Sequence, residues 1–305
     1  GIVYTPIEVV DFIINSVEEV LKAEFGQSLG DKDVHILDPF TGTGTFMVRL
    51  LQSGIIKKED LKRKFKSELH ANEIVLLAYY IAAINIEETY HGIMGGDYIP
   101  FEGAVLTDTF QLTENEIQGS FDSALPENSE RVEKQKKTKI NVIMSNPPYS
   151  SGQKSTNDNN KNLSYPLIDN SIRESYANLS SANNKKNLYD SYLRAIRWSS
   201  DRIGSSGVIG FVTNNSFLES NSMDGVRKSL VGEFDKIYIL NLKGNGRTSG
   251  EQCRIEGEPL FAAHGGSGGS LNGIAITIFI KSDSNKIKNF RLYVLYKWKI
   301  NYALI

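Results

Sequence analysis

Short apolar segments alternate with helical stretches along the whole chain, and this alternation most constrains the fold. Seven segments have the pattern of strands: Val34–Leu37, Leu69–Ile74, Ala104–Phe110, Ile140–Met144, Gly207–Thr213, Lys236–Leu242 and Ile274–Ile280. Continuously apolar strands that alternate with helices are typical of a parallel sheet covered by helices on both faces. The last two strands have no clear helix between them, so they are expected to pair antiparallel. The pattern predicts a doubly wound, seven-stranded α/β sheet, mostly parallel, with the last strand antiparallel.

Apolar residues at helical spacing predict the helices between these strands. The first helix is expected from about Pro6 to Lys22, with Thr5 as its N-cap. Further helices are expected to begin at Phe46–Leu51 and to cover Val75–Ile86 and Asp190–Ile203. Residues 111–139 and 150–187 are polar and are expected to be long loops, and Gly265–Gly269 forms a third, glycine-rich interruption.

Composition narrows the class of protein. The 305 residues include 34 Lys and Arg and 36 Asp and Glu, a net charge of −2, which excludes a polycation or an acidic disordered tail. No run of 18 apolar residues is present, so no membrane span is expected. One cysteine, Cys253, and four histidines argue against an internal disulfide and a structural zinc site. These features favour a cytoplasmic protein without a metal. The start at Gly1 suggests a fragment of a longer polypeptide.

A glycine-rich loop follows the first predicted strand and reads Asp38-Pro39-Phe40-Thr41-Gly42-Thr43-Gly44. Its glycines allow a tight turn and let a ligand approach backbone N–H groups at a helix N-terminus. Thr45 stands where a phosphate-binding loop needs lysine, and Met47 stands where a dinucleotide fingerprint has its third glycine. An acid directly ahead of the loop suits a ligand that carries an ammonium group. A plain strand–helix turn is the alternative.

Two further acids stand at predicted strand ends. Glu73 closes the second strand, where a carboxylate can accept both ribose hydroxyls of a nucleoside. Asp108 ends the third strand, where it can bind an adenine amino group with Phe110 or Phe40 against the ring. A surface acid is the alternative for Glu73, and helix capping is the alternative for Asp108.

The segment Ser145-Asn146-Pro147-Pro148-Tyr149, at the end of the fourth strand, has the sharpest chemical implication. Two prolines stiffen the turn and expose carbonyls for which no N–H of their own competes. The Asn146 side-chain oxygen and the Pro147 carbonyl can together accept two hydrogens from one planar amino group. Tyr149 offers a ring face to a planar heterocycle. A proline-stiffened turn without function is the alternative.

Together these motifs resemble the S-adenosylmethionine-dependent amino-methyltransferases that make N6-methyladenine in DNA. Asn-Pro-Pro-Tyr, preceded by Asp-Pro-Phe-Thr-Gly-Thr-Gly, carries the resemblance, and Tyr4-Thr5-Pro6 ahead of the loop matches the motif order of the gamma class. Further matches are Asn187–Tyr189, Gly207–Thr213 and Gly257–Phe261. The segments Leu69–Glu73 and Leu106–Phe110 are similar to the methyltransferase portion of type ISP, helicase-linked restriction–modification enzymes.

The resemblance implies an adenine-specific DNA methyltransferase with a Rossmann-like fold, S-adenosyl-L-methionine as cofactor and double-stranded DNA as substrate. It implies catalysis by Asn146, Pro147, Pro148 and Tyr149, with Tyr149 and Phe261 stacking on the flipped base; Phe217 competes for the second stacking position. The residues that it implies for cofactor binding are Tyr4, Thr5, Pro6, Asp38, Pro39, Phe40, Thr41, Gly42, Gly44, Glu73, Asp108, Phe110 and Asn146. Among these, Asp38 and the glycines surround the amino acid part, Glu73 holds the ribose and Asp108 holds the adenine amino group.

DNA contact requires cations near the site. The candidates are Lys154, Lys161, Lys185, Lys186, Arg247 and Arg254. The catalytic domain is expected to span residues 1–285, with residues 286–305 a linker or the start of a following domain. In the full-length protein, helicase or nuclease domains and a target-recognition domain are expected to be linked to it, in a cytoplasmic, nucleoid-associated enzyme.

Three other functions stay open at this point. An amino-methyltransferase with Asn-Pro-Pro-Tyr can also act on an RNA base or a protein glutamine. A catalytically silent cofactor-binding or DNA-binding module of a larger protein is a second alternative. A nicotinamide oxidoreductase is a third, weakened by Met47 and by the two prolines.

Overall fold

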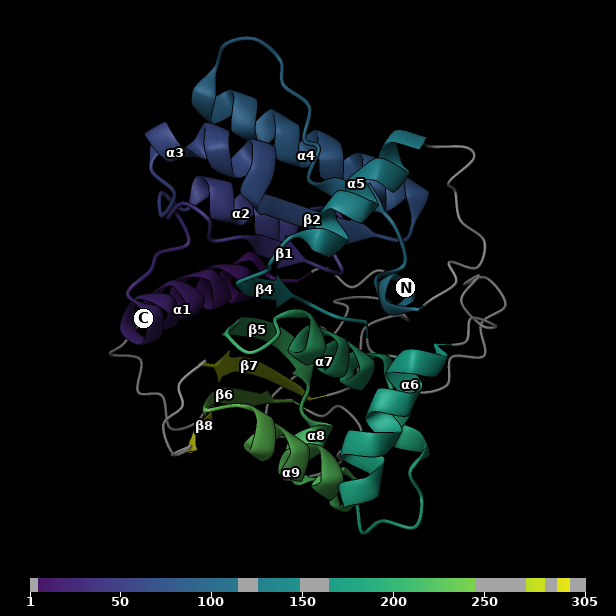
Figure 1. Cartoon of the computed structure of the whole chain (residues 1–305). Coiled ribbons are helices and arrows are strands. Elements are labelled where there is room, and N and C mark those ends of the chain that lie inside the picture. The colour runs from purple at the N-terminus through teal and green to yellow at the C-terminus, as the bar shows by residue number, and fades with distance from the viewer. Residues whose placement is uncertain (1–4, 115–125, 149–164, 245–272, 283–289, 297–305) are drawn as a thin grey trace, which may run out of the picture. The chain divides into compact units, whose positions relative to one another are not determined.

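The computed structural model describes residues 5–114, 126–148, 165–244, 273–282 and 290–296 (Figure 1). The chain divides into two compact units. The first unit consists of Pro6–Asn146 and Trp198–Gly210. The second unit consists of Gly1–Thr5, Pro147–Arg197 and Phe211–Ile305.

The first unit is built on parallel strands. They are β1 (Ile36–Asp38), β2 (Leu69–Glu73), β3 (Ala104–Leu106), β4 (Val142–Ser145) and the beginning of β5 (Gly207–Asn214). β1 pairs in parallel with both β2 and β4, and β2 pairs in parallel with β3. The chain therefore leaves β1 toward β2 and β3 and later returns on its other side to form β4. Ligands of doubly wound sheets bind beyond the carboxyl ends of the strands at such a reversal.

The helices of the first unit cover this sheet. They are α1 (Ile7–Phe25), α2 (Thr45–Gln52), α3 (Lys58–Arg63), α4 (Leu76–Met94) and α5 (Pro126–Lys137), with a π-helical turn η1 (Lys64–Glu68) and a 3-10 turn η2 (Thr109–Thr113). α2 contacts both α1 and α4, and α5 contacts β3 (Figure 1). Apolar residues of α1 that recur at helical spacing, such as Val10, Ile14, Val17 and Leu21, are buried, as the periodicity predicts.

The second unit contains the rest of β5 together with β6 (Lys236–Lys243), β7 (Ile274–Lys281) and β8 (Arg291–Tyr296). β6 pairs antiparallel with β7 and parallel with β8. Its helices are α6 (Pro166–Ile172), most of α7 (Ser191–Arg202), α8 (Ser216–Glu219) and α9 (Asp224–Glu233), with the turns η5 (Arg173–Ala177), η6 (Lys186–Tyr189) and η7 (Asn221–Met223). The strand order of the sheet is β3-β2-β1-β4-β5-β7-β6-β8.

The predicted fold class is confirmed: the protein is a mixed α/β protein with a mostly parallel sheet, and β7 is antiparallel to β6. Each of the seven predicted strands is found, and β8 is an additional strand within residues 286–305. The domain boundary after residue 285 stays a prediction.

Several local predictions were wrong. Residues 111–139 and 150–187 are not loops throughout, because α5 lies in the first range and α6, η5 and η6 lie in the second. Two of the three buried residues of α5, Asn128 and Gln135, are polar, so the helix lacks the apolar periodicity that predicts one. The N-cap of α1 is Pro6 rather than Thr5, and its carbonyl accepts hydrogen bonds from the Val9 and Val10 amides. Gly265–Gly269 lies outside the described residues. No helix in the described parts of the chain is long and apolar enough to span a bilayer.

Candidate active site

Three predicted site residues share one edge of the first unit's sheet. Asp38 is the last residue of β1, Glu73 is the last residue of β2, and Asn146 directly follows Ser145, the last residue of β4. Because β1 pairs in parallel with β2 and β4, the carboxyl ends of these strands lie together. The fold therefore brings the glycine-loop acid, the second acid and the asparagine to one edge.

The Asp38 carboxyl is fully buried at this edge. Its Oδ1 accepts hydrogen bonds from the Ser145 hydroxyl at 2.5 Å and the Phe40 amide at 3.2 Å. Its Oδ2 is buried and has no hydrogen-bond partner among the described residues. Burial raises the pKa of Asp38 to about 7, although the bonds from Ser145 and Phe40 oppose that rise. A buried carboxylate oxygen without a partner is stabilised by a cationic donor such as a ligand ammonium group.

The glycine loop has the geometry that its sequence requires. Gly42 and Gly44 adopt left-handed conformations, with φ of +58° and +90°. Gly44 is also the N-cap of α2 and lies close to α4, because a Cβ there would stand 3.3 Å from the Ala82 Cα and carbonyl oxygen. Asn85 of α4 donates a hydrogen bond to the Thr43 carbonyl at 2.9 Å. The loop is therefore held from one side by α4.

Glu73 shapes the same loop. Its Oε2 accepts a hydrogen bond from the Gly42 amide at 2.8 Å, and its Oε1 accepts one from the Val75 amide at 2.7 Å. Burial raises the pKa of Glu73 above its usual range, while these amide bonds oppose the rise. Each carboxylate oxygen has a second lone pair, so Glu73 can still accept hydroxyl donors from a ligand.

Asp108 does not end a strand. β3 ends at Leu106, and Asp108 is the N-cap of η2, where Oδ1 accepts a hydrogen bond from the Phe110 amide at 3.0 Å. The structure thus shows the capping alternative, and a role toward adenine stays a prediction. The Phe110 ring lies 5.4 Å from the Phe40 ring, at an interplanar angle of 55°. The two aromatic residues that were predicted to flank a base therefore lie together.

Three polar residues that the sequence analysis did not single out connect the loops. Thr109 donates from its hydroxyl to the Pro39 carbonyl at 2.5 Å, and Asn72 donates from Nδ2 to Thr109 Oγ1 at 3.2 Å. Ser145 joins β4 to Asp38. Asn72 is a fully buried polar residue of β2, and Ser145 is a fully buried polar residue of the otherwise apolar β4. Their place within or directly after predicted strands was the signal in the sequence that could have identified these residues, because buried polar groups need hydrogen-bond partners.

The remaining predicted site residues differ in how deeply they are buried. Asn146 is half-buried, Pro147 is buried and Pro148 is exposed. Phe217 is buried against Tyr192, with 1% of its surface exposed, so its ring offers no face to a base. Lys185 donates from Nζ to the Ala177 carbonyl at 2.6 Å, whereas Lys186 is exposed. The residues outside the described parts are Tyr4, Tyr149, Lys154, Lys161, Arg247, Arg254 and Phe261.

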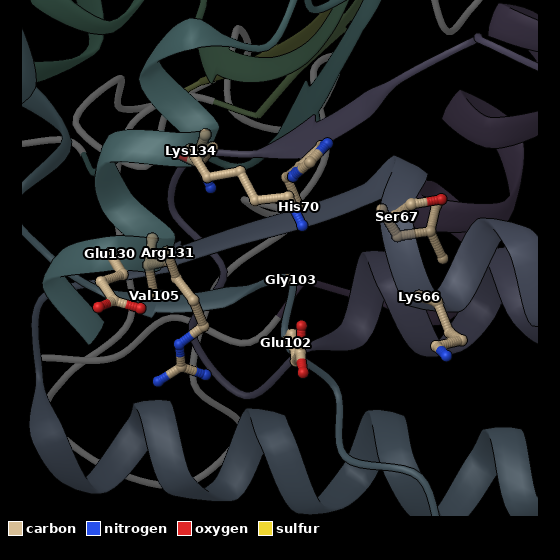
Figure 2. A pocket seen from close by; sticks show the side chains of 11 residues that line it. Lys66, Ser67, His70, Glu102, Gly103, Val105, Glu130, Arg131 and Lys134 are labelled. Carbon is tan, nitrogen blue, oxygen red and sulfur yellow. The ribbon is translucent and has the colours of Figure 1, made fainter. Parts of the chain in front are cut away.

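A pocket of about 220 Å³ lies elsewhere in the first unit (Figure 2). It is lined by residues at the amino ends of β2 and β3 and by α5, among them Lys66, His70, Glu102, Arg131 and Lys134. His70 is buried, which lowers its pKa to about 3, and one of its ring nitrogens lies 3.0 Å from a ring nitrogen of His35. None of the predicted catalytic or cofactor-binding residues lines this pocket, so it is separate from the candidate active site.

The sequence and the structure were compared with known proteins. Residues 1–240 match the family described as N-6 DNA Methylase. No curated protein matches the chain.

The solved structures that resemble the chain include larger restriction–modification enzymes. The type ISP enzyme LlaGI, a nuclease-deletion mutant in complex with a DNA substrate mimic, is 52% identical with a TM-score of 0.89, and the match covers 97% of this chain and 24% of that one. The ATP-dependent type ISP enzyme LlaBIII bound to DNA is 52% identical with a TM-score of 0.89, over 97% of this chain and 20% of that one. DrdV in complex with DNA is 42% identical with a TM-score of 0.87, and the match covers 97% of this chain and 28% of that one. The chain thus spans between a fifth and about a quarter of the length of these relatives.

Proposed function

Because the chain belongs to the N-6 DNA methylase family, whose members methylate adenine N6 in DNA from S-adenosylmethionine, we propose that the edge at Asp38, Glu73 and Asn146 is its active site. The observation that carries this proposal is the buried Oδ2 of Asp38, which has no hydrogen-bond partner among the residues that the structure describes. It belongs to a carboxyl that is hydrogen-bonded to Ser145, the residue directly before Asn146. A cation-binding group and the amino-binding motif are therefore joined by one hydrogen bond.

The residues present fit S-adenosylmethionine. When bound, the cofactor supplies a methyl group that its sulfonium charge has already activated. Asp38 would bind the cofactor's ammonium group, which gives Oδ2 a donor and favours the ionised carboxylate. Glu73 would accept the ribose hydroxyls with its remaining lone pairs, and Gly42 would let the ligand approach the backbone.

Asn146 and the residues after it would hold the target base. The adenine leaves the duplex at a cost of a few kcal/mol, which stacking and hydrogen bonds offset. The Asn146 side-chain oxygen and the Pro147 carbonyl would accept the two hydrogens of the amino group. As that nitrogen forms its new bond it gains positive charge, so the two acceptors bind it more strongly than they bind the ground state. No strong general base is required, because the product nitrogen loses its proton readily.

The role of Asn146 is tested by Asn146→Ala. We expect loss of methyl transfer with cofactor affinity nearly unchanged, because Asp38 and Glu73, rather than Asn146, are proposed to anchor the cofactor's ammonium group and ribose. Transfer of labelled methyl groups to DNA and calorimetric titration of the cofactor measure the two effects. Asn183→Ala, at an exposed asparagine in the second unit, is the matched control and should change neither. Equal loss of both properties in Asn146→Ala would contradict the assignment.

Tyr149 is proposed to stack on the extruded base. Tyr149→Ala should reduce methyl transfer much more than Tyr149→Phe or Tyr149→Trp, because the latter two keep a ring face. Single-turnover rates on one oligonucleotide duplex measure the difference. If the phenylalanine variant is as impaired as the alanine variant, stacking is not the role of Tyr149.

We further propose that this methyltransferase is the modification part of a longer restriction–modification polypeptide, in which helicase or nuclease domains and a target-recognition domain act on double-stranded DNA. The support is the identity of 52% to LlaGI and LlaBIII, of which this chain covers 24% and 20%. Sequencing of methylated genomic DNA from cells that express the full-length gene should show N6-methyladenine at one recurring site. Label in RNA or in protein glutamine, or cofactor binding without transfer, would replace this proposal by one of the alternatives.

A further inference from the structure

In the first half of helix α4, the alanines Ala78 and Ala82 are buried and the large apolar residues are exposed. This arrangement is the reverse of a surface helix in water, where the large apolar side chains face the core. α4 follows directly after Glu73 and Val75, so it belongs to the scaffold of the proposed site. Its inner and outer faces have separate explanations.

The inner face is fitted to the glycine loop. Its buried residues are Ala78, Ala82, Ile86 and Tyr90, which recur every four positions. Ala82 lies against Gly44, where a larger side chain on either residue would force the helix away from the loop. The close approach of α4 to the loop explains why residue 82 is an alanine.

The outer face of α4 consists of Leu77, Tyr80, Ile81 and Ile84. These side chains are exposed by 70%, 50%, 38% and 59%, and their spacing places them on one stripe opposite the buried alanines. An exposed apolar patch of this kind marks a surface that another group covers.

The chemistry of α4 restricts what can cover this face. The helix has no Lys or Arg, and Glu87 and Glu88 follow the apolar stripe. A DNA backbone or an anionic membrane surface is therefore a poor match, because both are bound through cations. Large aliphatic and aromatic side chains without cations are typical of permanent protein interfaces.

We propose that the outer face of α4 docks a domain of the same polypeptide that lies outside residues 1–305 and presents an apolar surface. This inference rests on the proposed function as part of a longer polypeptide. The relatives that are 42–52% identical contain this chain as only 20–28% of their length, so most of such a polypeptide lies outside it. Two domains of one chain stay docked when the interface between them is large and hydrophobic, and this agrees with the apolar composition of the face.

The test uses the full-length protein with a photo-crosslinking amino acid in place of Leu77 or, separately, Ile84. We expect irradiation to crosslink both positions to peptides from outside residues 1–305 of the same polypeptide. Val231, an apolar residue of α9 that is 44% exposed, is the matched control and should crosslink at least tenfold less. Peptide mass spectrometry identifies the partner segment.

A second measurement is independent of crosslinking chemistry. In full-length protein that carries Cys253→Ser, Leu77→Cys and Ile84→Cys should react with a thiol reagent at least tenfold more slowly than Val231→Cys, although Leu77 is the more exposed residue in this structure. Equal or faster reaction would overturn the proposal. Crosslinks within residues 1–305, or crosslinks between two polypeptides that rise with protein concentration, would overturn it as well. Because neither readout requires methyl transfer, a failure here is distinguishable from a failure of the proposed function.

Discussion

The Asp38 carboxyl is shielded from solvent and is suited to bind a cationic ligand group. Its Oδ1 is held by Ser145 and Phe40, while its Oδ2 has no partner in the described parts of the chain. The pKa of about 7 means that this group binds a proton more tightly in the folded chain than in the unfolded one. Stability should therefore fall as pH rises from the ordinary pKa of 3.8 to about 7, where the folded state must lose that proton.

Asp38→Asn should raise the stability of the cofactor-free protein at pH 8 and leave it nearly unchanged near pH 4, where the aspartate is already neutral. The gain is at most about 4 kcal/mol, from a shift of roughly three pKa units. The same variant should bind S-adenosylmethionine at least tenfold more weakly, because it has lost the charge. Urea denaturation at both pH values and calorimetry measure the two effects.

Asp97→Asn, at an exposed aspartate, is the control and should change neither property. A pH dependence of stability that is the same for Asp38→Asn and the unmodified protein would show that Asp38 is already ionised without cofactor.

The positions of the site residues in the fold could be predicted from the sequence, but their hydrogen-bond partners could not. Asp38, Glu73 and Asn146 stand at or directly after the ends of strands, and parallel strands end at one edge, so their proximity followed from the pattern. The bond from Ser145 to Asp38 joins residues 107 positions apart and depends on the register of β4 against β1. No local pattern contains that information.

At the scale of elements, α2 and α4 meet at the glycine loop. Gly42 and Gly44 both have positive φ, but they differ in surroundings: a Cβ on Gly42 would meet nothing within 4 Å, whereas one on Gly44 would meet Ala82 at 3.3 Å. Alanine in place of Gly42 therefore tests backbone strain alone, whereas alanine in place of Gly44 tests strain and crowding together.

Gly42→Ala should cost about 1 kcal/mol of stability, from the left-handed backbone. Gly44→Ala should cost about 3 kcal/mol, because displacement of α4 adds to that strain. Urea denaturation of the two variants gives the comparison, and equal losses would contradict the crowding. Gly42→Ala should in addition weaken cofactor binding, which calorimetry measures.

The helix α5 shows why one element could not be predicted. Asn128 accepts from the Leu106 amide at 2.8 Å and donates to the Leu106 carbonyl at 3.0 Å, so its side chain occupies the hydrogen-bonding positions of a neighbouring strand along β3. α5 is thus held by polar contacts with a partner distant in sequence, and apolar periodicity does not reveal such an element. The strands β1 to β5 and β7, whose burial is nearly continuous, were predictable for the opposite reason.

At the scale of the whole molecule, the chain passes between its two units at four points, and one of these is the Asn146–Pro147 pair, inside the proposed catalytic motif. The motif order along the sequence predicted the fold but could not predict this division. Net charge is −2, so the DNA binding that we propose requires local groups of cations rather than an overall field.

Lys186→Ala should weaken DNA binding and lower the slope of log affinity against log salt by about 0.9, because one phosphate contact is lost. Its neighbour Lys185 serves as the comparison: Lys185→Ala should also reduce stability, since its Nζ donates to the Ala177 carbonyl. Affinities measured between low and physiological salt check the slope. An unchanged slope for Lys186→Ala would remove Lys186 from the DNA contacts.

The hydrogen bond between Ser145 and Asp38 also bears on protein engineering. Transplanting the Asn-Pro-Pro-Tyr turn onto another scaffold would leave the serine ahead of it without its acceptor, and transplanting the glycine loop would remove a donor from the aspartate. The two segments are therefore expected to move between proteins only as a matched set. A redesign of base specificity should keep both and vary the loops around them.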